Sequence, residues 1–67
     1  FHTEHDGHVR ARVFSLGGQV VDTMVDEFLP AGRHSYVWDA SGHASGVYVI
    51  VVETRGARDS RKVTLLK

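Results

Sequence analysis

The segment from Gly46 to Thr54 is dominated by valine, and it constrains the fold more than any other part of the chain. β-Branched side chains lose rotamer freedom in a helix and pack well on a pleated sheet, so this composition favours a strand. Its purely apolar part, Val47 to Val52, is far too short to cross a bilayer. We therefore expect a strand whose two faces are both apolar, which is typical of the interior of a β-protein.

Other segments show the two-residue alternation of half-buried strands, and turn residues separate them. No segment has a convincing helical period, and a short antiparallel sandwich or barrel is therefore predicted. The further strands are expected at His8–Phe14, Gln19–Val25, Arg33–Trp38 and Ser60–Leu66, with a stub at Phe1–Thr3. The connections are expected at the Gly17-Gly18 turn, the Asp26–Gly32 loop and the Arg55–Asp59 hairpin loop.

The chain has 67 residues, enough for one small domain, and we expect residues 1–67 to form a single unit. There is no cysteine, so no disulfide stabilises it and cysteine-based zinc sites are excluded. The formal net charge is zero. A neutral domain is a poor candidate for nucleic acid or anionic membranes, where excess positive charge supplies most of the attraction. Because the chain opens on Phe1 rather than Met, we expect a fragment of a larger precursor.

The run from Trp38 to Tyr48 joins two predicted strands through a loop of small residues. Gly42 and Gly46 suit a loop that turns between two sheets, and Asp39 is placed to accept backbone N–H bonds there. Trp38 and Tyr48 are expected to fill the core, with their polar atoms at its rim. These residue types offer little for chemistry, so the run predicts a structural motif and no active site.

Taken together, the predicted elements resemble the C-terminal sorting domain of the type IX secretion system, and the related immunoglobulin-like domain of the flagellar hook-capping protein. The short Trp38–Tyr48 loop and the lysine-ended tail favour the sorting domain. The family's opening strand is reduced here to Phe1–Thr3. The resemblance covers nearly the whole chain and is carried, in order, by Val9–Phe14, Gly17–Val21, Leu29–His34, Trp38–Tyr48 and Arg61–Lys67.

This resemblance implies a small antiparallel immunoglobulin-like β-sandwich of about six strands with a truncated first strand. It implies a non-catalytic sorting and anchoring domain that directs a secreted cargo across the bacterial outer membrane. Such a domain passes through the periplasm and reaches the cell surface or the medium, and its partners are the secretion and attachment machinery. No cofactor is implied. The sorting tail would include Lys62, Val63, Leu65, Leu66 and Lys67.

Two other functions remain open at this point. The first is a structural or assembly module, such as a hook-capping-like domain or an extracytoplasmic accessory subunit of a multi-protein membrane complex. The second is a carbohydrate-binding sandwich, which would need Trp38 and Tyr36 exposed as a stacking platform. In either case the partners would be found outside the cytoplasm.

Metal binding and catalysis have little support. His2, His5 and His8 are the only weak candidates for metal ligands, because imidazole suits zinc or nickel. On a strand His2 and His8 share a face and His5 lies opposite, so a solvated hairpin is the better interpretation. Ser45 with Asp39 and either His43 or His34 could be drawn as a catalytic triad, but close spacing on one loop does not supply the required geometry. We expect no enzyme activity.

Two surfaces are candidates for protein contacts. Val47, Val49 and Val51 form one face of the valine strand and are expected to be exposed unless something covers them. The basic residues Arg55, Arg58, Arg61 and Lys62 form a patch in the sequence, which is interpreted first as a solvated hairpin. An anionic partner is the alternative for that patch.

Overall fold

The computed structural model describes residues 1–67 and contains strands without any helix. The prediction of an all-β antiparallel protein with about six strands is confirmed. The strands form two antiparallel sheets, an arrangement compatible with a small β-sandwich. Their bounds are β1 His2–Thr3, β2 Gly7–Ser15, β3 Val20–Leu29, β4 Gly32–Arg33, β5 Gly46–Thr54 and β6 Ala57–Leu65.

The larger sheet has the strand order β3-β2-β5-β6, and β2 and β5 occupy its centre. The alternation in β2 explains this position, because Val9, Ala11 and Val13 are all nearly inaccessible to solvent. Across the ladder, Ala11 lies opposite Val25 on β3 and opposite Val52 on β5. Residues directly opposite each other point to the same face, so these apolar side chains form one inner face.

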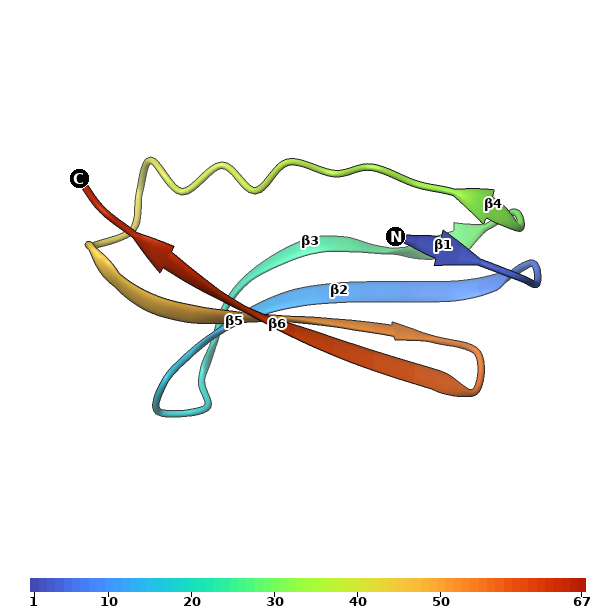
Figure 1. The fold of residues 1–67 in the computed structure, drawn as a ribbon, viewed down its shortest axis with the longest axis horizontal. Helices are drawn as coiled ribbons and strands as arrows, with labels where there is room; N and C mark the ends of the chain where they lie inside the picture. Colours follow the sequence, from blue (N-terminus) through green and yellow to red (C-terminus); the bar gives the residue numbers. More distant parts are fainter.

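The second layer is thin and consists of β1 paired with β4 over two residues each. Beyond β4 the chain continues through residues 34–40, which we call the strap. Only His34, at its start, is bonded to the backbone of β1's neighbour Phe1. The strap runs along the inner face above β3, and its far end lies near the C-terminus (Figure 1). The order of the chain thus places Trp38 over the larger sheet and brings the tail beside it.

Two of the predicted strands differ most from the structure. The strand expected to end at Val25 continues to Leu29, where a loop was expected from Asp26. It continues because Asp26 and Phe28 lie opposite Arg10 and His8 in the ladder with β2. The strand expected at Arg33–Trp38 is assigned only over Gly32–Arg33, since no strand lies beside the strap beyond His34.

The predicted glycine turns are confirmed in part. Gly18 and Gly56 have φ angles of 88° and 75°, a region that residues with a Cβ atom rarely occupy. Gly17 has no positive φ. The hairpin between β5 and β6 is tighter than predicted, because only Arg55 and Gly56 separate the strands.

Candidate functional site

Trp38 holds the strap onto the larger sheet. Its indole Nε1 donates a hydrogen bond of 2.8 Å to Oδ2 of Asp22 on β3. Its ring meets that of Tyr48 edge-on, with the ring centroids 5.2 Å apart, and lies 5.3 Å from the imidazole of His43. Edge-on aromatic contacts add to the free energy that the buried area supplies. Tyr48 is buried, as expected of a core residue, whereas Trp38 is only half-buried and lies at the edge of the sheet's inner face.

Asp22 and His43 belong to this cluster, although Asp22 was not predicted and His43 was considered only for a catalytic triad. His43 Nε2 lies 3.7 Å from Asp22 Oδ2, so a protonated imidazole would form an ion pair with that carboxylate. Asp22 is one of several acidic residues on β3, and no local motif distinguishes it from them. The role of Asp22 as the acceptor for Trp38 follows only from the position of the strap over β3. No pattern in the sequence predicts that position.

The loop between Trp38 and Tyr48 is held by its own hydrogen bonds. As predicted, Asp39 accepts a backbone N–H bond, which comes from Ser41 at 3.1 Å. Hydrogen bonds from Ser41 lower the pKa of the Asp39 carboxyl, and Lys67 and His43 lower it further. The Tyr48 hydroxyl donates to the Ala44 carbonyl at 2.6 Å. The loop is therefore a fixed shape on the sheet.

The two glycines of the loop differ in what they do. Gly46 begins β5 and has a positive φ, whereas Gly42 has none. A Cβ atom at either position would meet no neighbour within 4 Å. The expectation that Gly42 supplies a conformation forbidden to other residues is therefore wrong. The loop turns at Gly42 with a backbone that other residues can adopt.

The C-terminal tail closes onto this loop. The backbone N–H of Lys67 donates to Ser45 Oγ at 3.0 Å, and Lys67 Nζ donates to the Ser41 carbonyl at 2.9 Å. We call these two bonds the loop–tail contact. The other predicted tail residues lie on or after β6: Val63 and Leu65 are half-buried, Lys62 is exposed, and Leu66 is exposed with no strand pairing.

The predicted apolar strip of β5 is only partly exposed. Val47 and Val49 are half-buried, whereas Val51 is 6% exposed, so of the three valines expected to be exposed unless something covers them, Val51 is covered. Val51 lies directly opposite Arg12 on the outer face of the sheet. Long arginine side chains cover apolar neighbours with their methylene groups, which explains the burial.

The outer face carries a small charge network instead of an open valine surface. Glu53 Oε1 accepts from Arg12 at 2.8 Å and from Arg10 at 3.3 Å. The hydrogen bond from Arg12 is the main cause that lowers the pKa of Glu53, and Arg10 adds to it. The Arg12 guanidinium also stands over the Phe14 ring, 5.1 Å from its centroid. The face is thus occupied by partners from within the chain.

The basic residues near the second hairpin do not form one patch. In the register of β5 and β6, Arg58 lies opposite Glu53 and Lys62 opposite Val49, on the outer face. Arg61 lies opposite Ile50, on the inner face. Alternation along β6 separates charges that are close in the sequence.

The three histidines named as weak metal candidates lie apart. His2 is on β1, His5 follows it in a bend, and His8 on β2 is bonded to the carboxylate of Asp26. No group of three or more histidine, aspartate or glutamate side chains in the structure is placed to hold a metal ion. Ser45, considered for a triad, accepts the hydrogen bond from Lys67 instead.

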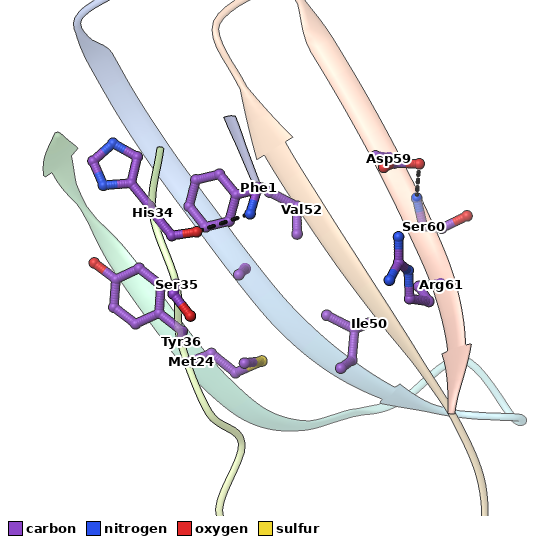
Figure 2. Close-up of a pocket in the computed structure, with 11 residues that line it drawn as sticks. Phe1, Met24, His34, Ser35, Tyr36, Ile50, Val52, Asp59, Ser60 and Arg61 are labelled. Atoms are coloured by element: carbon purple, nitrogen blue, oxygen red, sulfur yellow. Dashed lines mark hydrogen bonds between the residues drawn. The ribbon is translucent and has the colours of Figure 1, made fainter. Parts of the chain in front are cut away.

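The inner face is open at the end opposite the aromatic cluster. Figure 2 shows a groove between the strap and β6, with Ile50 and Val52 of β5 at its floor and Arg61 on its β6 side. Its volume is about 290 Å³. Phe1 lies at the strap side, with its ring stacked 6.0 Å from that of Tyr36. We call this the groove end, and the cluster of Trp38, His43 and Tyr48 the aromatic end.

Comparisons with protein-family models, curated proteins and solved structures find no match to this chain. None of its elements is a helix that is long and apolar enough to cross a membrane.

Proposed function

We propose that this chain is a non-catalytic C-terminal sorting domain that directs a larger secreted protein across the bacterial outer membrane. The proposal starts from the ordered set of sequence motifs that resembles the type IX sorting domain. The observation that carries it is the loop–tail contact. The two segments with the most specific resemblance, the Trp38–Tyr48 loop and the lysine-ended tail, lie together at one end of the fold.

Because the loop and the tail lie together, a receptor could recognise them as one continuous surface. The loop is fixed by its own hydrogen bonds, and Lys67 joins it from the other side. Leu66 stands next to the contact and is 85% exposed, so it is free to enter an apolar site on the secretion machinery. The domain would act in the periplasm and at the outer membrane, and would need no cofactor.

The direct test is export of a reporter enzyme. The reporter is fused in front of Phe1 and expressed in a bacterium with a type IX system, and surface and medium activities are compared with those of the unfused reporter. The proposal expects export only with the domain present. Equal retention of both proteins in the periplasm would contradict it.

A pair of leucines separates recognition from folding. Leu66→Ala alters the tail, and Leu16→Ala alters the β2–β3 turn, whose residues take no part in the loop–tail contact. Leu16 is 71% exposed, so both variants should keep the stability of the fold. We expect Leu66→Ala to reduce export severalfold and Leu16→Ala to leave it unchanged. Deletion of residues 63–67 is expected to abolish export, but it also removes part of β6.

A structural or assembly module is the second candidate, and the groove end favours it. Half-buried Ile50 and Val52 at the floor of a groove are suited to contact another polypeptide. Under this alternative a subunit would copurify with the chain at a fixed ratio, with no cargo joined to it. A stacking platform for sugars is not favoured, because Trp38 is committed to Asp22 and Tyr48.

A further inference from the structure

The backbone of the strap lacks partners over most of its length. His34 is the last residue to pair: its N–H donates to the Phe1 carbonyl at 2.8 Å and its carbonyl accepts from the Phe1 nitrogen at 2.8 Å. From Ser35 to Asp39 no backbone group makes a hydrogen bond within the chain. Extended backbone with free N–H and C=O groups is a template for another strand.

The existing pairs fix the register that such a strand would adopt. Thr3 lies opposite Gly32 and His2 opposite Arg33, and the two bonds between Phe1 and His34 continue this antiparallel ladder. In an antiparallel pair these doubly bonded positions recur every second residue. The next one on the strap is Tyr36, followed by Trp38. A regular continuation of this ladder would turn the N–H and C=O groups of both residues to the same side as those of His34, and His34 and Tyr36 line the groove.

The groove has the shape and chemistry to receive that strand. Phe1 leads into it from the strap side, and its floor includes Met24, Ile50 and Val52. The opposite side is polar, with Asp59 and Arg61 of β6. A strand with apolar side chains at every second position would cover the floor and leave its other side chains in water.

We propose that the polypeptide joined to the nitrogen of Phe1 extends β1 and fills the groove as a strand antiparallel to residues 35–39. The inference rests on the proposed function, since a C-terminal sorting domain is joined to its cargo through Phe1. The second and fourth residues before Phe1 lie opposite Tyr36 and Trp38 and are apolar. The first and third face solvent. The linker to the cargo is thereby part of the folded domain.

The test uses three forms of the chain that differ only in five residues placed before Phe1. The first extension, Thr-Val-Thr-Val-Thr, puts valine opposite Tyr36 and Trp38. The second, Val-Thr-Val-Thr-Val, has valine and threonine interchanged, and the third is Gly-Ser-Gly-Ser-Gly. Amide hydrogen exchange at Tyr36 and Trp38 is followed by NMR for each.

We expect exchange at these two amides to be about tenfold slower with the first extension than with the other two. Equal exchange in all three would overturn the proposal. Equal protection by free Thr-Val-Thr-Val-Thr peptide would also overturn it, in favour of a strand from a partner. The exchange measurement does not involve secretion, so a negative result overturns only the proposed strand and not the sorting function. A failed export assay with protection intact overturns the sorting function alone.

Discussion

The two ends of the inner face are built from the same strands, but only one of them is covered by side chains. At the aromatic end, Trp38, His43 and Tyr48 cover β5, and Asp22 accepts from the indole. At the groove end the same strap lies to one side of Ile50 and Val52 and leaves a volume of about 290 Å³ above them. Large aromatic side chains close one end, and nothing of the chain closes the other.

The difference shows how much of a sheet's apolar face a small chain can cover with its own side chains. A domain of 67 residues has few side chains to cover a four-stranded sheet. Here Trp38, Tyr48 and the loop–tail contact lie where we propose that a receptor binds. The apolar floor at the other end is left for a further strand. Substitutions at each end therefore test this division.

The largest effect is expected from Tyr48→Ala at the aromatic end. The side chain is 9% exposed and contacts Trp38, so truncation should cost about 3 kcal/mol. That loss is comparable to the whole stability of so small a domain. Urea unfolding followed by Trp38 fluorescence measures it.

Ile50→Ala is the matched change at the groove end. Because the half-buried side chain borders an open groove, its loss should cost only about 1 kcal/mol. An equal loss for the two variants would contradict the difference between the ends.

A smaller effect is expected from Asp22→Ala. The change leaves the half-buried Trp38 N–H without an acceptor and removes the neighbour of His43, at a cost of about 1.5 kcal/mol. Asp26→Ala, on the same strand, removes an exposed partner of His8 and is the control, with little effect expected. Urea unfolding of both variants would show whether Asp22 is the specific support of the aromatic end. Equal losses would argue against it.

Ser45→Ala probes the loop–tail contact alone. It removes the acceptor of the Lys67 N–H and should cost about 0.5 kcal/mol, seen chiefly as faster exchange of that amide. Ser35→Ala is the control, because the exposed Ser35 makes no hydrogen bond. Unchanged exchange at Lys67 in the Ser45 variant would mean that the tail is held by other contacts.

Acid and alkali should act on different ends. The pKa of Asp39 is lowered below 3.8 by hydrogen bonds from Ser41, so its contribution to stability is present above that pH and is lost on acidification. The pKa of Tyr36 is raised above 10.0 by burial and by Glu27, so its contribution is present below that pH and is lost in alkali. Acid should therefore loosen the aromatic end and alkali the groove end.

NMR titration of the amide chemical shifts in the loop and in the strap measures the pH response of each end. Asp39→Asn should remove the acid response of the loop, and Tyr36→Phe the alkaline response of the strap. A response of both ends in the same pH range would disagree with the separation.

The sequence predicted the strands of the larger sheet better than the strap that lies over it. Alternation in β2 and the valines of β5 depend on local side-chain periodicity, and both strands form where they were expected. The strap also alternates, with His34, Tyr36 and Trp38 facing inward, yet it lacks ladder partners. Alternation reports which face a residue takes, and pairing depends on what lies beside it.

Within the candidate site, the sequence predicted only the contacts between residues of one short segment. Asp39 capping Ser41 is a contact within the loop, and the sequence contains it. Asp22, Ser41 and Ser45 act across elements far apart in the chain, so their roles needed the fold. The burial of Val51 was missed for the same reason, because its cover is an arginine on β2.

Amide hydrogen exchange of the unmodified chain tests most directly that hydrogen bonds within the chain hold the loop and the tail but not the backbone of the strap. His43 and Lys67 donate their N–H groups within the loop and the loop–tail contact, at 3.0 Å each, whereas Tyr36 and Trp38 donate theirs to nothing in the chain. We predict measurably slower exchange at His43 and Lys67 than at Tyr36 and Trp38 once intrinsic rates are removed. Equal rates at all four, or greater protection of the strap, would contradict the account.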